Sequence, residues 1–135
     1  VKMQKSNMFE AFNSRLGRKK FDLIISNPPY IESSVIPTLQ REVKDYEPMM
    51  ALDGGEDGLD FYRIIASEGE DYLQKNGVIM LEIGYDQGKA VTEMLQETGS
   101  FVSIRCLKDL AGKDRIVVAR LEDKKKRKNN RKAEK

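Results

Sequence analysis

The stretch FDLIISNPPY, residues 21–30, decides the fold. Its first part, Phe21 to Ser26, is an apolar run that predicts a short strand. The strand has to end at Asn27-Pro28, because proline lacks a backbone N–H and restricts the residue before it. A second run, Val78 to Ile83, is almost continuously apolar and indicates another strand that is buried on both faces.

A helix is expected between these two apolar runs, and another is expected after the second run. Apolar residues keep helical spacing from Asp60 to a break at Asn76-Gly77, and a further helix is expected after Asp86, which can cap it. This alternation predicts an α/β fold with a parallel sheet and right-handed crossovers. Two more strands are expected at residues 101–107 and 115–121. The connection between them is too short for a crossover helix, so the last strand should be antiparallel.

The first 59 residues give weaker patterns. Residues 1–3 alternate like the end of a strand, and residues 6–16 predict a short amphipathic helix. Residues 31–59 look irregular, with a helical stretch near residues 37–44. A loop of this length is usually functional or disordered. Its glycine cluster, residues 54–58, fits either a flexible substrate lid or an ordinary turn.

Composition excludes several classes of protein. The 135 residues are enough for one domain, and no apolar run approaches the roughly 18 residues of a membrane span. The chain has no histidine, which excludes a Ser-His-Asp triad, a Cys-His pair and an imidazole metal site. Cys106 is the only cysteine, so neither an intrachain disulfide nor a zinc site is expected, and no metal site is predicted. These features and the absence of a signal peptide favour a cytoplasmic protein.

Charge is unevenly distributed along the chain. The net charge is +2, but residues 124–135 hold eight Lys or Arg and one acid. This leaves 16 basic and 21 acidic residues in residues 1–123, a net charge of −5. We expect residues 1–123 to form the folded part and residues 124–135 to be a disordered basic tail. An alternative role for the tail is weak contact with RNA or the ribosome.

The tetrapeptide at residues 27–30 is the strongest chemical signal. It follows a strand, at the sheet edge where α/β proteins bind ligands. Asn27 offers a side-chain oxygen acceptor, and the prolines offer carbonyls without competing N–H groups. Tyr30 adds a flat aromatic face. The sequence therefore predicts a pocket for a planar –NH2 group, although an Asn-Pro turn that only closes the strand is the alternative.

Two other residues, Glu82 and Cys106, carry weaker predictions. Glu82 follows the second strand and is expected to be structural, pairing with Arg115, for which Asp114 competes. Cys106 is most simply a small core residue.

FDLIISNPPY resembles the signature of S-adenosylmethionine-dependent amino-group methyltransferases, and other segments narrow the resemblance to the HemK/PrmC family. These segments are EVKDYEP (residues 42–48), ALDGG (51–55), DGL (57–59), Tyr62-Arg63, LEIG (81–84) with Gln87, and DLAGKDR (109–115). The resemblance covers about residues 1–121. It implies the C-terminal half of a Rossmann-like class I methyltransferase sheet, with S-adenosylmethionine as cofactor.

The resemblance also implies roles for individual residues. Asn27, Pro28 and Tyr30 would be catalytic, and with Pro29 and Glu47 they would bind substrate. Asn27 would also contact the cofactor. So would Asn7, in a segment where the family has an acid that contacts the adenine amine.

The family's glycine-rich cofactor loop is absent from this sequence and should lie before Val1. We therefore expect this chain to be the C-terminal part of the enzyme, inactive on its own.

The expected activity is methylation of the glutamine side-chain amide in the Gly-Gly-Gln loop of peptide chain release factors. Two alternatives stay open. One is an adenine N6-methyltransferase on RNA or DNA, which uses the same tetrapeptide but should have a basic cleft for phosphates. The other is a non-catalytic fragment that binds a partner through its basic tail.

Overall fold

The apolar run at the start of FDLIISNPPY forms strand β3 (Phe21–Ser26), as predicted. This computed structural model describes residues 1–14, 17–39 and 48–123. From β3 the chain reaches helix α3 (Asp60–Glu68) and then strand β4 (Leu73–Glu82), which pairs with β3 in parallel. A helix between two parallel strands is the βαβ unit of α/β proteins, so this part of the fold prediction is confirmed.

The second half of the sheet is antiparallel, also as predicted. Helix α4 (Gly88–Glu97) leads into strand β5 (Phe101–Lys108), and β6 (Asp114–Leu121) follows. Strand β6 pairs antiparallel with both β5 and β4, which gives the order β3-β4-β6-β5. Asp109 closes the β5–β6 connection, because its Oδ1 accepts the N–H groups of Ala111 and Lys113 at 2.9 and 3.0 Å.

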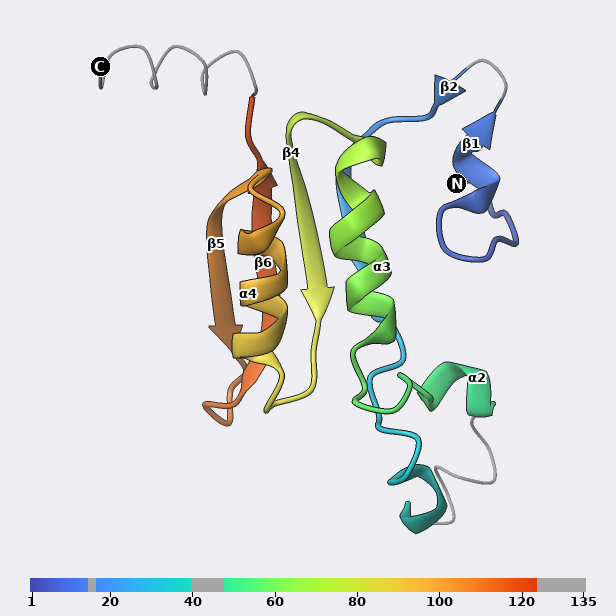
Figure 1. Ribbon diagram of the computed structural model, residues 1–135, viewed down its shortest axis with the longest axis vertical. Helices are drawn as coiled ribbons and strands as arrows, with labels where there is room; N and C mark the ends of the chain where they lie inside the picture. Colours follow the sequence, from blue (N-terminus) through green and yellow to red (C-terminus); the bar gives the residue numbers. More distant parts are fainter. Residues whose placement is uncertain (15–16, 40–47, 124–135) are drawn as a thin grey trace.

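Both long helices, α3 and α4, lie on the same face of the four-stranded sheet (Figure 1). Strand β4 turns Ile79 and Leu81 toward them, and these side chains are completely buried. On the other face, Leu23 and Ile25 of β3 are 47% and 70% exposed. Within the described residues, no helix has the length and apolar character needed to cross a bilayer.

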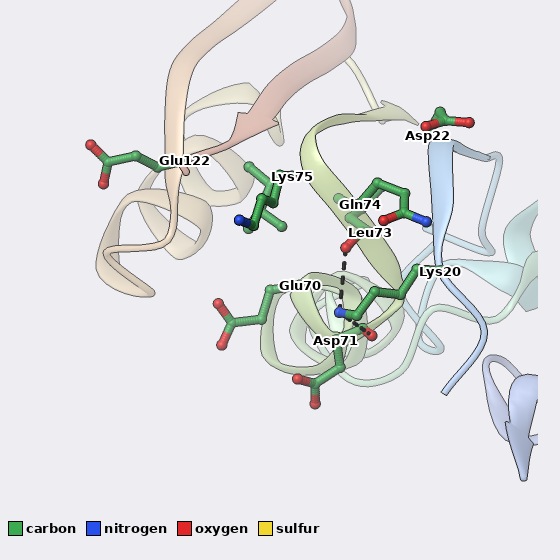
Figure 2. A pocket seen from close by; sticks show the side chains of 9 residues that line it. Lys20, Asp22, Glu70, Asp71, Leu73, Gln74, Lys75 and Glu122 are labelled. Atoms are coloured by element: carbon green, nitrogen blue, oxygen red, sulfur yellow. Dashed lines mark hydrogen bonds between the residues drawn. The ribbon is translucent and has the colours of Figure 1, made fainter. Parts of the chain in front are cut away.

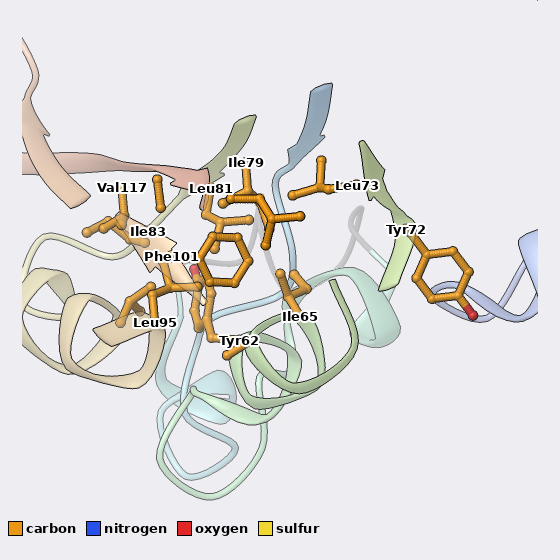
Figure 3. Packing of buried hydrophobic residues seen from close by; sticks show 14 of the residues in the cluster. Tyr62, Ile65, Tyr72, Leu73, Ile79, Leu81, Ile83, Leu95, Phe101 and Val117 are labelled. Carbon is orange, nitrogen blue, oxygen red and sulfur yellow. The ribbon is translucent and has the colours of Figure 1, made fainter. Parts of the chain in front are cut away.

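The core forms between this covered face and the two helices (Figure 3). Tyr62 and Ile65 project from α3, and Leu95 projects from α4, toward the buried side chains of β4. Each large buried side chain contributes roughly 1.5–3 kcal/mol through removal of apolar surface from water. The Tyr62 hydroxyl donates a hydrogen bond of 2.7 Å to the Glu82 carbonyl, and burial raises the pKa of this phenol. Tyr62 therefore connects α3 to the end of β4.

Removing that hydroxyl tests the connection. We expect Tyr62→Phe to lower the free energy of unfolding by about 1–2 kcal/mol, because the buried carbonyl loses its partner. Tyr85→Phe is the control, since Tyr85 is 63% exposed and should change stability by less than about 0.5 kcal/mol. Urea denaturation of the two variants measures the difference. Equal stability of both variants would contradict the predicted role.

The N-terminal predictions are wrong. Residues 1–3 form no strand, and residues 6–14 contain a short 3-10 helix, η1 (Glu10–Phe12), in place of the expected amphipathic helix. A small antiparallel pair, β1 (Asn13–Ser14) with β2 (Gly17–Arg18), follows. Phe9 stacks on Tyr72 with ring centroids 4.6 Å apart. This contact holds the N-terminal segment beside the start of β4. Local helical spacing could not predict such a long-range contact.

The helix that begins at Asp60 ends earlier than predicted. Helix α3 stops at Glu68, a 3-10 helix η3 (Gly69–Tyr72) follows, and β4 begins immediately. Asn76-Gly77 therefore lies inside the strand, where Asn76 has a φ of +60°. The register between β3 and β4 shifts at this point, so the Asn-Gly pair makes an irregularity within β4 and not the end of a helix.

The remaining helices also differ in detail from the predictions. In the long loop, the structure describes a 3-10 helix η2 (Ile36–Thr38) and a short helix α2 (Met49–Leu52). The helical stretch predicted near residues 37–44 falls largely outside the described residues. Asp86 does not cap α4, whose N-cap residue is Gln87 and has no side-chain cap.

Candidate functional site

The tetrapeptide lies at the carboxyl end of β3, at the edge of the sheet where β4 also ends. Asn27 is exposed, Pro28 is buried, and Pro29 and Tyr30 are half-buried. Among the described residues, no hydrogen bond occupies the Asn27 side chain. Its carboxamide is therefore available to a ligand.

A hollow of about 130 Å³ lies beside Asn27. Met80, Glu82 and Ile116 also line it, because the register places the end of β4 next to the end of β3 and the start of β6. The hollow is small and mainly apolar. Ser26 and Asn27 are its polar lining residues, and Glu82 is its charged one. Its lining could receive the end of a ligand that carries an amide or a positive charge.

The predicted pairing of Glu82 with Arg115 is wrong. Arg115 Nη2 lies 3.1 Å from the Asp109 Oδ2 atom, and Lys108 holds Asp114 at 2.8 Å. The hydrogen bonds that Arg115 donates to the Asp109 carboxylate raise the pKa of the Arg115 guanidinium. Glu82 has no salt bridge to Arg115 in the part of the chain that the structure describes. The sequence places Glu82 at the end of a strand and favours a structural role, whereas the structure places it in the lining of the hollow beside Asn27.

Cys106 is half-buried and packs against the core, as expected for a small apolar residue. Burial raises the pKa of its thiol, and the nearby Asp114 carboxylate acts in the same direction. Both effects favour the neutral thiol, which agrees with a packing role.

A second hollow, of about 380 Å³, lies beside Tyr30. Its charged lining residues are Glu32, Asp57 and Asp86. Arg63 forms a salt bridge with Asp57, and this contact lowers the pKa of that carboxyl. The hollow next to Tyr30 is therefore acidic, although the charge of one carboxylate, Asp57, is neutralised by Arg63.

The glycine cluster at residues 54–58 packs directly against the chain that follows Tyr30. The Ile31 N–H donates to the Leu52 carbonyl at 3.0 Å, and the Gly54 N–H donates to the Ile31 carbonyl at 2.8 Å. A side chain on Gly54 would overlap the Cα atom of Tyr30. This close backbone pairing favours the turn, of the two predicted alternatives, over a flexible lid.

Asp53 stabilises the same turn. Its Oδ1 accepts the Ser33 hydroxyl at 2.6 Å and the Gly55 N–H at 3.0 Å. These two hydrogen bonds, the first more strongly, hold the pKa of the Asp53 carboxyl below its usual range. The segment after Tyr30 is thus connected to residues 52–55 through both backbone and side-chain contacts.

Gln87 joins the tetrapeptide to two other loops. Its Nε2 lies 3.0 Å from the Tyr30 carbonyl oxygen, and the residue is buried. Sequence reasoning noted this glutamine only as part of the family resemblance. Nothing in the local pattern indicates a contact between residues 57 positions apart in the chain.

The other predicted site residues lie apart from these hollows or outside the described residues. Asn7 is exposed, donates a hydrogen bond of 3.0 Å to Glu10, and lines a separate hollow that also contains Met50. The structure therefore does not place it in a hollow with the tetrapeptide. Glu47 and the basic tail lie outside the described residues.

A hollow of about 490 Å³ lies at the opposite end of the sheet, where β3 and β4 begin (Figure 2). Lys20 crosses it and donates to the carbonyls of Asp71 and Leu73 at 3.1 and 3.5 Å. Because ligands of open α/β sheets bind at the carboxyl ends of the strands, we assign the candidate site to the tetrapeptide end.

Comparison with known proteins identifies the family of this chain. A family model described as Eco57I restriction-modification methylase matches residues 2–83, more than half of the chain. The chain is also similar to a solved structure of a release factor-specific protein-(glutamine-N5) methyltransferase from Alicyclobacillus acidocaldarius. The TM-score is 0.50 and the identity 28%, over 77% of this chain and 50% of that one.

Curated relatives narrow the family further. The release factor glutamine methyltransferase of Clostridium botulinum is 50% identical over 121 residues, which are 89% of this chain and 41% of the relative. The enzyme of the same name from Geobacter sulfurreducens is 47% identical over 78% of this chain and 37% of its own length. This chain thus spans about two fifths of the relatives that it matches. The chain belongs to the methylase family that the Eco57I model describes, and its relatives identify it as a HemK/PrmC-type member.

Proposed function

We propose that this chain forms the acceptor side of an S-adenosylmethionine-dependent methyltransferase. Its substrate would be the side-chain amide of the glutamine in the Gly-Gly-Gln loop of a peptide chain release factor. The observation that carries the proposal is the exposed Asn27 carboxamide at the carboxyl end of β3, beside a hollow that Glu82 also lines. The names of the relatives support the choice of a release factor as the partner.

The tetrapeptide residues suit the acceptor amide. A glutamine –NH2 group has two hydrogens to donate. In our proposal, Asn27 Oδ1 accepts one of them and the Pro28 carbonyl accepts the other, while Tyr30 packs beside the amide plane. The proline ring fixes φ and so limits the orientations of the carbonyl. Little conformational entropy is therefore lost when the substrate binds.

These two acceptors would also favour the reaction. An amide nitrogen is a poor nucleophile, because its lone pair is delocalised into the carbonyl. As the N–C bond forms, positive charge grows on the nitrogen, and both acceptor oxygens stabilise it. The methylated amide cation is strongly acidic and releases its proton to water, so the mechanism needs no histidine or other general base.

The described residues fit the methyl-bearing end of the cofactor. Bound S-adenosylmethionine would supply an electrophilic methyl group on a positively charged sulfur. The Glu82 carboxylate beside the small hollow would favour that positive charge, and Asn27 would lie next to the methyl group. Asn7 would contact the adenine amine, as the family resemblance implies.

An adenine N6-methyltransferase acting on nucleic acid is the second candidate, which the name of the matching family model favours. The charge distribution disfavours it. Residues 1–123 carry a net charge of −5, and the hollow beside Tyr30 has acidic lining residues. Both features would repel phosphates.

Methyl transfer in a hybrid enzyme tests the proposal. In this hybrid, the chain replaces the 121 matched residues of the Clostridium botulinum relative. We expect it to transfer a labelled methyl group to a release factor, at the glutamine of the Gly-Gly-Gln loop, and not to duplex DNA or RNA. The 135-residue chain alone should show no turnover. Labelling of nucleic acid but not of the release factor would contradict the proposal.

A further inference from the structure

Gln87 connects three segments that meet beside the tetrapeptide. Its Nε2 donates to the carbonyl oxygens of Tyr30 and Gly58 at 3.0 and 3.1 Å. Its Oε1 accepts the Gly84 N–H at 2.9 Å. A carboxamide has two N–H donors and one oxygen acceptor, so both donors and the oxygen are occupied by backbone groups. With only 8% of the residue exposed, this side chain serves the protein backbone and not a ligand.

The main chain of Gln87 is held as firmly as its side chain. The Gln87 N–H donates to the Gly84 carbonyl, and the Gln87 carbonyl accepts the Val91 N–H in the first turn of α4, each at 3.0 Å. Gln87 is thus the N-cap residue of a ten-residue helix. A side chain that starts from such a fixed position can hold a loop in place.

The tetrapeptide is consequently held at both ends. Before Asn27, Ser26 pairs with Leu81 in the parallel β3–β4 ladder. After Pro29, the carbonyl of Tyr30 is held by Gln87. Between these two points lie two prolines, whose φ angles are fixed by their rings. Few conformations remain for the acceptor groups of Asn27 and Pro28.

We propose that Gln87 is a positioning residue for methyl transfer. It holds the tetrapeptide in the conformation that presents the Asn27 and Pro28 oxygens to the substrate amide. This inference rests on the function proposed above. A glutamate at this position would have the same size, but its carboxylate would place negative charge against the two carbonyl oxygens of Tyr30 and Gly58. Charge repulsion would then separate the segments that the glutamine joins.

The kinetics of Gln87→Glu in the hybrid enzyme test the positioning role. We expect kcat to fall by about a hundredfold, because a displacement of about 1 Å at the reacting groups has an effect of this size. KM for the release factor should stay within about threefold, since the reacting amide is only a small part of the contact with a protein substrate. Gln96→Glu is the matched control, because Gln96 is an exposed residue of the same helix. It should leave both constants unchanged. Wild-type kcat in Gln87→Glu would overturn the inference.

Amide hydrogen exchange in the 135-residue chain tests the same role without an activity measurement. In Gln87→Met, the N–H groups of Ile31 and Gly54 should exchange at least about tenfold faster, while that of Leu81 in β4 should not change. Unchanged exchange at Ile31 and Gly54 would overturn the inference. If the unaltered hybrid transferred no methyl group to release factor while exchange rose as expected, the proposed function would fail and the loop-holding role of Gln87 would stand.

Discussion

Replacing Asn27 with alanine should reduce kcat of the hybrid enzyme by about a hundred- to a thousandfold, the usual effect of losing one group that stabilises transition-state charge. The variant keeps both prolines and therefore the shape of the turn. It loses the side-chain oxygen that accepts a substrate N–H in the proposed mechanism. Single-turnover methyl transfer to release factor measures the effect on the chemical step.

The Asn27→Ala chain should remain folded. Asn27 is exposed, and its side chain has no hydrogen-bond partner among the described residues. The free energy of unfolding should therefore change by less than about 0.5 kcal/mol. Asn13→Ala is a suitable control, because Asn13 is an exposed asparagine in β1, away from the sheet edge. A variant at Asn27 with the activity of the Asn13 variant would exclude the tetrapeptide as the acceptor site.

The four-stranded sheet was largely predictable because its signals are local. The apolar runs that form β3, β5 and β6 end at turn residues, and the short β5–β6 connection requires an antiparallel pair. The start of β4 was not predictable. Asn76-Gly77 is a turn signal, and its backbone does adopt a positive φ at Asn76. The β4 residues before and after this Asn-Gly pair nevertheless pair with β3, so the two residues lie within one strand.

The site was predictable only in part, for a similar reason. Asn27 and its proline neighbours are a contiguous motif, so their position at the strand end follows from the sequence. Glu82 becomes a neighbour of Asn27 only through the strand register. Gln87 meets Tyr30 through a hydrogen bond that spans 57 residues. Such contacts depend on the tertiary fold and leave no periodic pattern in the sequence.

Gly58→Ala should be among the most damaging single substitutions in the described part of the chain. Gly58 has a φ of +71°, and an added Cβ would overlap the Tyr30 carbonyl oxygen and lie 2.9 Å from Gln87 Nε2. Backbone strain and overlap together should lower the free energy of unfolding by about 3 kcal/mol or more. Because relief requires Tyr30 to move, methyl transfer by the hybrid should fall at least about a hundredfold as well.

Gly112→Ala separates strain from overlap. Gly112 has nearly the same backbone angle, a φ of +77°, but nothing lies within 4 Å of its added Cβ. It should therefore cost only the left-handed strain of alanine, about 1–2 kcal/mol, and leave kcat unchanged. Urea denaturation and single-turnover kinetics of the two variants give the comparison. If both variants lost the same stability and kept full activity, contact between Gly58 and Tyr30 would have no part in holding the tetrapeptide. A larger loss of both stability and methyl transfer in the Gly58 variant would instead mean that the turn at residues 54–58 determines where the acceptor oxygens lie.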